Sequence, residues 1–252
     1  MRRTATKPTQ EGYSIATIIP TDSMPPADAF IAIRHLLKHY TEGDLRRTIF
    51  ANLTLDIPRG QFVALLGQSG SGKSTLLNLL GGIDLPDAGR IRIDDLTLTA
   101  LSEVERTRFR RRHIGFVFQF FNLIPTLTTE ENLLLPLELN GLVSPDRRDQ
   151  AMELLDNVGL GNRRHSFPER LSGGEQQRLA IVRALVHDPL LLLADEPTGN
   201  LDAATGERIL DLLLTLHQRA ATTIVMVTHS REVAARADRI LMVDGGYLRE
   251  VQ

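Results

Sequence analysis

A glycine-rich segment contains the residue types that hold a chain of phosphates. It matches the pattern G-x-x-x-x-G-K-[ST] and reads Gly67-Gln68-Ser69-Gly70-Ser71-Gly72-Lys73-Ser74-Thr75. Glycines allow backbone N–H groups to approach phosphate oxygens, and the N-terminus of a helix adds partial positive charge. Lys73 would place a full charge on the β- and γ-phosphates, and the Ser74 hydroxyl can ligate Mg²⁺. The segment therefore predicts a nucleoside triphosphate site that also holds Mg²⁺.

A pair of carboxylates supplies the second half of the expected chemistry. Asp195 and Glu196 come directly after the apolar run Leu190–Ala194. Burying an unpaired charge is costly, so two acids at the end of a buried strand indicate function rather than packing. A phosphate loop needs a carboxylate on a neighbouring strand to hold the metal, and we assign this role to Asp195. Glu196 is then the candidate base that orients or deprotonates the attacking water.

The segments around these motifs alternate between strand and helix patterns. Gln61–Leu66 is a short apolar strand that runs into the glycine loop, and the helical pattern Lys73–Leu80 follows. Ile224–Thr228 is apolar throughout, as is typical of a strand buried in a parallel sheet. Alternating apolar residues in 31–57 indicate strands before the loop. Helical signals cluster in 128–158, so we expect an α/β core interrupted by a helical insertion.

The composition is that of an ordinary globular chain. It has 252 residues, 42% of them apolar and 24% charged, with a formal net charge of −2. This charge provides no global attraction to nucleic acid or anionic lipid. The absence of cysteine excludes disulfides and cysteine-based metal sites. No run approaches the ~18 consecutive apolar residues of a membrane span. If the protein acts at a membrane, we expect other subunits to cross it.

Two segments lie outside the predicted chemistry. Residues 1–29 are rich in Thr, Pro, Ser and Ala, which predicts a flexible N-terminal extension without contact to the core; a regulatory tail is the alternative. The basic run Arg106–Arg112 would suit nucleic acid, but Phe109 is the one aromatic residue within it. We interpret the run as a solvated face or a contact with a partner subunit or lipid headgroups. We predict no nucleic-acid partner.

A second glycine motif narrows the class of protein. It reads Leu171-Ser172-Gly173-Gly174-Glu175-Gln176-Gln177-Arg178 and resembles the signature L-S-G-G-Q/E of the ABC family without a mismatch. Its hydroxyl and bare backbone would form a second small anion cradle at the start of a helix. In the ABC family this cradle closes over the γ-phosphate bound by the other subunit. The resemblance therefore implies a dimer of two copies that sandwiches ATP and contacts it through Ser172, Gly173 and Gly174.

The remaining elements of the ABC family occur in the expected order, and the resemblance implies a role for each. Gln119 resembles the Q-loop glutamine, which senses Mg²⁺ and links to the transmembrane partner. Asp202 resembles the acidic member of the D-loop. His229 closes a strand downstream of the acidic pair and resembles the switch histidine that contacts the γ-phosphate. Tyr40 fits the aromatic residue that stacks on adenine, with a partly buried strand tyrosine as the alternative.

Three stretches resemble a narrower group, the lipoprotein-releasing and macrolide-exporting ATPases, to which the cell-division ATPase and the heterocyst glycolipid exporter are close. They read Tyr40-Thr41-Glu42-Gly43-Asp44, Phe120-Phe121-Asn122-Leu123-Ile124-Pro125 and Ala194-Asp195-Glu196-Pro197-Thr198-Gly199-Asn200-Leu201-Asp202. The resemblance extends from Ile31 to the C-terminus. Two departures are the long N-terminal extension and Val182, which stands where alanine is typical.

The predicted fold is α/β: a RecA-like P-loop core, an antiparallel β-subdomain near the N-terminus and an inserted helical subdomain over about 122–170. Residues 30–252 would form this ABC ATPase domain. The resemblance implies an ATPase motor at the cytoplasmic face of the plasma membrane that powers export or extraction through separate transmembrane permease subunits. An ABC ATPase that drives mechanotransmission, as in cell division, is the alternative. The expected catalytic residues are Lys73, Gln119, Glu196, Asp202 and His229, and the expected metal ligands are Ser74, Gln119 and Asp195.

Overall fold

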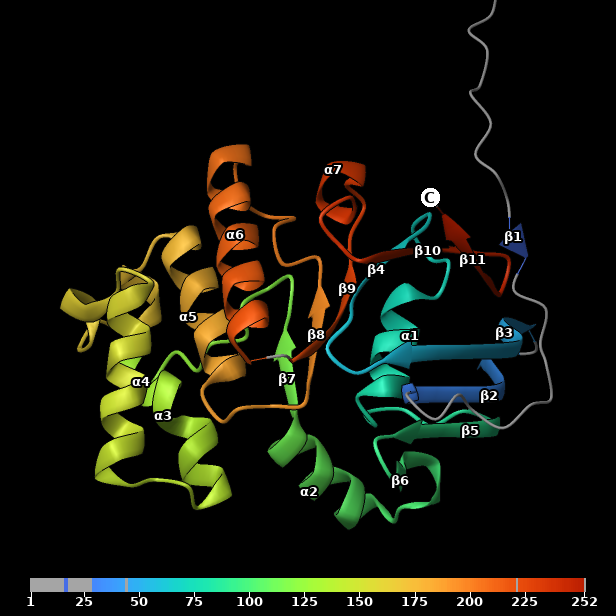
Figure 1. The fold of residues 1–252 in the computed structure, drawn as a ribbon, viewed down its shortest axis with the longest axis horizontal. Coiled ribbons are helices and arrows are strands. Elements are labelled where there is room, and N and C mark those ends of the chain that lie inside the picture. The colour runs from blue at the N-terminus through green and yellow to red at the C-terminus, as the bar shows by residue number, and fades with distance from the viewer. Residues whose placement is uncertain (1–15, 18–28, 44, 221, 252) are drawn as a thin grey trace, which may run out of the picture.

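The computed structural model describes residues 16–17, 29–43, 45–220 and 222–251, which form two sheets with helices around them (Figure 1). Within these residues the larger sheet has seven strands in the order β1-β11-β10-β4-β9-β8-β7. The strands from β10 to β7 are parallel, while β11 and β1 add antiparallel at one edge. In sheet order the strands are Ala16–Thr17, Tyr247–Val251, Arg239–Asp244, Phe62–Leu66, Thr223–Val227, Leu191–Asp195 and Ile114–Val117. The predicted parallel α/β core is confirmed.

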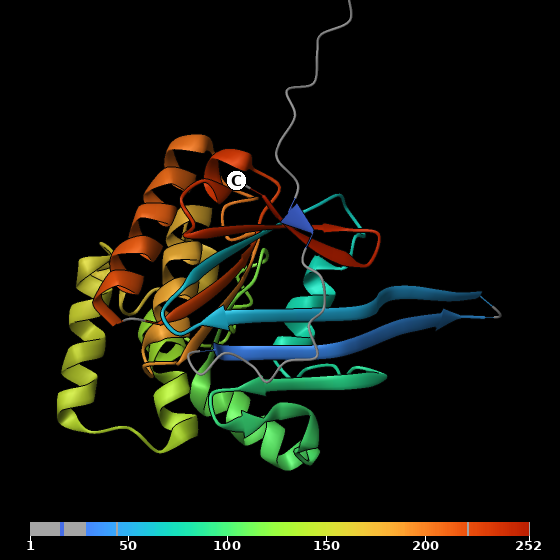
Figure 2. The same ribbon diagram turned by 45° about the vertical axis from the view of Figure 1, so that its right-hand side comes forward.

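The second sheet is antiparallel and confirms the predicted β-subdomain. Its strands, in the order β3-β2-β5-β6, are Leu45–Pro58, Ala29–Glu42, Ala88–Ile93 and Leu96–Thr97. Strands β2 and β3 form a long hairpin whose tip extends beyond the rest of the domain (Figure 2, blue strands). Because side chains alternate between the faces of a strand, Ile31 and Ile33 on β2 share one buried face. An irregularity in the register between Ile33 and Leu36 returns Leu36 to that face.

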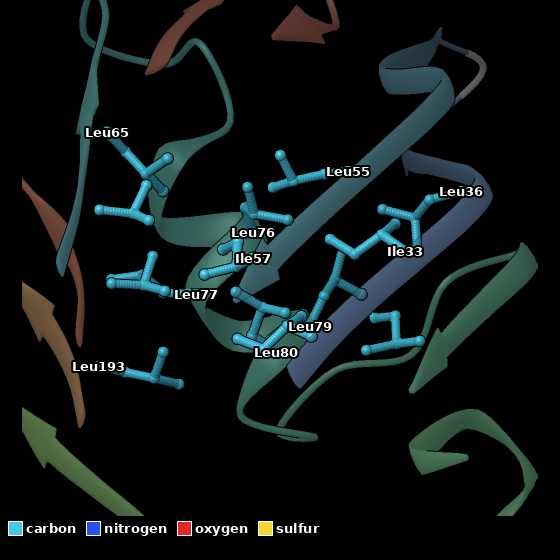
Figure 3. Packing of buried hydrophobic residues seen from close by; sticks show 14 of the residues in the cluster. Ile33, Leu36, Leu55, Ile57, Leu65, Leu76, Leu77, Leu79, Leu80 and Leu193 are labelled. Carbon is cyan, nitrogen blue, oxygen red and sulfur yellow. The ribbon is translucent and has the colours of Figure 1, made fainter. Parts of the chain in front are cut away.

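Helix α1 (Lys73–Leu80) lies buried between the two sheets (Figure 3). Four of its leucines are at most 3% exposed: Leu76, Leu77, Leu79 and Leu80. They share one core with Ile33 of the hairpin and Leu193 of the large sheet. An isolated helix shorter than about 12 residues is marginal in water, so packing rather than propensity holds α1 in place. The phosphate loop begins this helix, and its position therefore depends on the same core.

The large sheet is covered on both faces. On β8, Leu191 and Leu193 face the core around α1, whereas Leu192 and Ala194 pack with residues of α5 (Gly173–Leu185) and α6 (Ala203–Ala220). This alternation follows from the two-residue period of a strand and explains why the whole run is apolar. The helices and helical turns beyond α1 are η1 (Leu98–Ala100), α2 (Glu103–His113), α3 (Thr129–Asn140), α4 (Pro145–Asn157), η2 (Gly161–Arg163), η3 (Pro168–Arg170), α5 (Gly173–Leu185), α6 (Ala203–Ala220) and α7 (Arg231–Ala234).

Helices α3 and α4 occupy the region predicted as a helical subdomain. Their buried residues, such as Leu133 and Leu155, form a cluster that also includes Leu179 and Val182 of α5. Helix α5 additionally packs on the large sheet through Ile181 and other residues. The helical cluster therefore extends past residue 170 and is joined to the core by α5.

The basic run lies on α2, and its interpretation needs a correction. Arg106 is only 5% exposed, donates a hydrogen bond to the carbonyl of Leu101 and pairs with Glu103. Arg108 and Arg111 are exposed, as expected of a solvated face. The predicted solvated face, or contact with a partner subunit or lipid headgroups, does not extend to Arg106, because a long arginine stem can cover apolar surface while its head finds polar partners.

The N-terminal boundary also needs a correction. Ala16 and Thr17 pair antiparallel with β11, and Ala29 is a buried residue of β2. The prediction of a segment 1–29 without contact to the core is wrong at these positions, since pairing at a sheet edge uses backbone groups that no side-chain pattern reveals. The other residues of the segment lie outside the described part of the chain.

None of the helices that the structure describes combines the length and the apolar character required to cross a membrane.

The shared core predicts a large difference between two leucines of the hairpin. Leu36 is fully buried, whereas Leu45 is 78% exposed near the tip. Leu36→Ala should lower the free energy of unfolding by about 2–5 kcal/mol, because it leaves a cavity in the core. Leu45→Ala should change it by less than about 0.5 kcal/mol. Urea denaturation of the nucleotide-free proteins measures both, and equal effects would contradict this description of the core.

Candidate active site

The phosphate loop joins β4 to α1 and requires glycine at its bends. Gly67, Gly70 and Gly72 have φ angles of 153°, 74° and 106°, which side chains other than hydrogen rarely permit. A Cβ on Gly72 would lie 2.6 Å from a methyl group of Ile49, and one on Gly67 would lie 2.5 Å from the carbonyl oxygen of Val243. The loop is therefore enclosed by segments from both sheets.

Lys73 is held inside the curve of the loop. Its Nζ donates to the carbonyls of Gly67, at 2.9 Å, and Gln68, at 2.8 Å. Burial lowers the pKa of Lys73, and the nearby carboxylates of Glu196 and Asp195 oppose that effect. The loop carbonyls and the two acids thus stabilise an ammonium group in a largely buried position, where phosphate would meet it.

A cavity of about 270 Å³ opens beside the loop and collects many of the predicted residues. Its lining comprises Tyr40, Arg47, Ile49, Ser69, Gly70, Gly72, Lys73, Ser74, Thr75, Glu196 and His229. Gln68 and Ser71 line a larger adjoining cavity of about 520 Å³, together with Arg47, Ser69 and Gly70. Residues from the hairpin, the loop and the ends of two parallel strands therefore meet around one space, as in the ligand sites of open α/β sheets.

Two lining residues, Arg47 and Ile49, were missed by the sequence analysis. Both lie on β3, across the hairpin from the segment that contains Tyr40. The turn dipeptide Gly43-Asp44 is a sequence signal that could have suggested this pairing.

Glu196 and His229 form a pair at the carboxyl ends of β8 and β9. Nε2 of His229 lies 2.7 Å from Oε1 of Glu196, which is hydrogen-bond distance. Glu196 has a φ of 47°, a left-handed conformation that costs a non-glycine residue on the order of 1–3 kcal/mol. Its N–H donates to the carbonyl of Val227 and its own carbonyl accepts from Gly199, each at 3.0 Å. These backbone bonds keep the strained residue in place and direct its side chain towards the cavity.

The oxygen donors near the loop fit a small, hard cation such as Mg²⁺. Asp195 is the last residue of β8 and pairs with Val227 in the neighbouring strand, while the hydroxyl-bearing Ser74 lines the cavity. The described residues contain no group of three or more His, Cys, Asp or Glu side chains arranged to hold a metal. One carboxylate and one hydroxyl suit Mg²⁺ when nucleotide phosphates complete its coordination.

A polar network positions Tyr40 in the lining of the cavity. Its hydroxyl donates to Oδ2 of Asp84 at 2.8 Å, and Nζ of Lys38 lies 2.8 Å from Oδ1 of the same carboxylate and 4.8 Å from the tyrosine ring centroid. Burial, and then the bond to Asp84, raise the pKa of Tyr40, so the hydroxyl remains a donor. Tyr40 as a whole residue is 39% exposed, so its side chain is accessible for stacking.

The signature residues lie apart from this cavity in the described structure. Ser172 caps α5: its hydroxyl accepts from the N–H of Glu175, and the carboxylate of Glu175 accepts from the N–H of Ser172 at 2.8 Å. Ser172 and Gly173 are exposed and Gly174 is half-buried. The cradle is therefore accessible at the surface and does not line either cavity beside the phosphate loop of its own chain.

Gln119 and Asp202 also lie outside the lining of the 270 Å³ cavity. Asp202 precedes α6, and its carboxylate accepts from the N–H of Thr205 at 3.0 Å. Hydrogen bonds from the side chain and then from the N–H of Thr205 lower the pKa of Asp202. Gln119 follows β7, and its carbonyl accepts from Asn200 at 2.9 Å. The structure thus links the Q-loop to the D-loop, but neither the side chain of Gln119 nor that of Asp202 lines the cavity.

Known proteins of one family resemble the chain over most of its length. Residues 50–199 match the family described as ABC transporter. The chain is 51% identical over 218 residues to an ABC transporter ATP-binding protein of Mycobacterium tuberculosis that is named as uncharacterized, covering 86% of this chain and 88% of that one. It is 46% identical over 223 residues to the lipoprotein-releasing system ATP-binding protein LolD of Xanthomonas campestris pv. campestris, covering 88% of this chain and 93% of that one.

A solved structure shows the same fold. It is the ATP-binding cassette MJ0796, described as a dimeric post-hydrolysis state bound to ADP and Pi. It matches with a TM-score of 0.81 and 42% identity, covering 88% of this chain and 97% of that one. Similarity of this extent in both sequence and structure means that the chain belongs to the ABC transporter family, as an ATP-binding subunit that hydrolyses ATP.

Proposed function

We propose that this subunit works as a dimer of two copies, with each ATP held between the phosphate loop of one chain and the signature loop of the other. The observation that carries this proposal is the separation of the two cradles. The cavity beside Lys73 is lined by the loop, Tyr40, Glu196 and His229, whereas Ser172 is exposed elsewhere on the chain. The dimeric form of the cassette MJ0796 supports the same arrangement.

The proposed reaction is phosphoryl transfer to water by positioning and electrostatic stabilisation. Lys73 and the loop N–H groups would neutralise charge on the β- and γ-phosphates, and Tyr40 would stack on adenine. Glu196 would orient the attacking water and accept its proton, while His229 holds Glu196 and contacts the γ-phosphate. Mg²⁺, bound by Ser74 and Asp195, would supply further charge neutralisation at the phosphates. Gln119, the third predicted ligand, lies outside the lining of the cavity.

The Q-loop is a candidate route from the nucleotide to the transmembrane permease subunits. Arg183 of α5 donates to the carbonyls of Phe121 and Asn122, at 3.0 and 2.7 Å, directly after Gln119. The segment is thereby bonded to the signature helix at one end and to the D-loop at the other. Rearrangement of α5 on dimer closure would move it, and permease subunits docked there would receive that motion at the cytoplasmic face of the membrane.

We propose export or extraction of a lipid-anchored substrate as the work that this ATPase powers. Identity of 46% to a subunit named for lipoprotein release supports that class of cargo. Mechanotransmission, as in cell division, would use the same motor. Co-purification of the membrane partner, followed by determination of its topology, separates the two: a partner that lacks a substrate path would exclude transport.

Glu196→Gln should bind ATP and nearly stop turnover, by at least about 100-fold, because an amide can hydrogen-bond water but cannot accept its proton. Size-exclusion chromatography with ATP and Mg²⁺ should show a trapped dimer. Glu153→Gln, at an exposed position on α4, is the matched control and should hydrolyse ATP normally. Turnover near that of the unaltered chain would remove Glu196 from the role of base.

Lys73→Ala should weaken ATP binding itself, by about 10- to 100-fold, because a charged hydrogen bond to phosphate is lost. A direct binding titration measures the dissociation constant. Circular dichroism of the variant confirms that the domain is folded. Unchanged ATP affinity would contradict the assignment of Lys73 to the phosphates.

The shared site predicts which chains a cross-link joins. The sequence contains no cysteine, so Ser69→Cys together with Ser172→Cys introduces one defined pair. In the Glu196→Gln background with ATP, oxidation should yield a disulfide between subunits, seen as a dimer on a non-reducing gel. The single-cysteine variants are the controls. A disulfide confined to one chain would overturn the shared-site arrangement.

A further inference from the structure

Arg47 is placed beside Tyr40 by the register of the hairpin. The two residues are direct partners across β2 and β3. Side chains of directly opposed residues lie on the same face of an antiparallel pair, about 4.5–5.5 Å apart at Cβ. Arg46 is paired with Thr41 and therefore lies on the opposite face, where its guanidinium contacts His39 at 3.0 Å. One arginine thus faces the cavity and its neighbour faces away.

The guanidinium of Arg47 reaches the middle of the phosphate loop. Its Nη2 donates to the carbonyl of Gly70 at 2.8 Å. Arg47 lines both the 270 Å³ cavity and the adjoining 520 Å³ cavity, and so contributes to the wall between them. The smaller cavity is also lined by Tyr40, Lys73, Glu196 and His229. Arg47 therefore shares one space with the predicted nucleotide-binding residues.

The charge of Arg47 has no counter-ion within the described residues. The neighbouring cation Lys38 is neutralised, since it pairs with Asp84 at 2.8 Å. Arg47 bonds to a carbonyl, which leaves its positive charge and most of its five N–H donors unused. A planar, always charged guanidinium in this position is suited to phosphate oxygens.

We propose that Arg47 is a nucleotide-binding residue that places its guanidinium against the phosphates of bound ATP. The assignment follows from two observations: Arg47 lines the same cavity as Lys73, and it bonds directly to Gly70 of the phosphate loop. By holding the Gly70 carbonyl, Arg47 also stabilises the loop from the hairpin side. This inference deepens the proposed nucleotide site and rests on it.

The test uses binding titrations in the hydrolysis-deficient Glu196→Gln background, with ATP and with inorganic tripolyphosphate as a base-free probe. Arg47→Gln should weaken both ligands by about tenfold, the effect of one charge-assisted hydrogen bond. Arg47→Lys should recover part of the loss because it retains the charge. Arg46→Gln, one residue away on the opposite face, is the matched control and should bind like the parent.

Each outcome bears on the proposal. Equal affinity of Arg47→Gln and the parent would overturn it, as would an equal loss in Arg46→Gln. A loss for ATP with unchanged tripolyphosphate binding would place Arg47 at the base and contradict the phosphate contact. A melting temperature of nucleotide-free Arg47→Gln equal to that of the parent shows that the loss arises at the ligand. Normal ATP affinity in Lys73→Ala would contradict the proposed nucleotide site as a whole. Normal ATP affinity in Arg47→Gln alone would contradict only the role of Arg47.

Discussion

The packing of α1 between the two sheets is the constraint on which the active site depends. The helix has too few residues to be stable alone, and its leucines are buried against both sheets. The loop before it is enclosed in the same way: Gly72 lies against Ile49 of the hairpin, and Gly67 lies against Val243 of the large sheet. A shift of either sheet would therefore change the curve of the loop and the position of Lys73.

The reacting groups stand at the ends of paired parallel strands, and one of them, Glu196, has a strained backbone. Strands β8 and β9 are parallel neighbours, so Asp195, Glu196 and His229 emerge at the same edge of the sheet. The left-handed backbone of Glu196 would be unfavourable in isolation. Backbone bonds to Val227 and Gly199 hold it in this conformation. Preorganisation of this kind fixes a carboxylate before the substrate arrives, which is what electrostatic stabilisation of a transition state requires.

The two halves of the proposed composite site serve different structural tasks within one chain. The phosphate loop is enclosed by the core, whereas the signature loop caps a helix and remains on the surface. Helix α5 belongs to both the helical cluster and the large sheet, and its Arg183 holds the segment after Gln119. In the proposed dimer, contact of ATP with the signature loop would therefore reach the Q-loop through one rigid helix.

Much of this protein could be predicted from the sequence by itself. The glycine loop, Lys73, the apolar run before Asp195 and the strand before His229 are local patterns, and local geometry follows from a few neighbouring residues. The order of strands and helices then indicated the α/β fold, and the resemblance to one family implied the ATPase.

Contacts between distant residues were decided only by the tertiary structure. The pairing of Tyr40 with Arg47 depends on hairpin register, and the bond from Tyr40 to Asp84 joins residues far apart in the chain. Burial of Arg106 and the edge pairing of Ala16 depend on surfaces that form after folding. The sequence determined which chemical groups are present and the local elements that carry them. The packing of the two sheets around α1 decided which groups meet, because distances between remote segments depend on the whole core rather than on any local pattern.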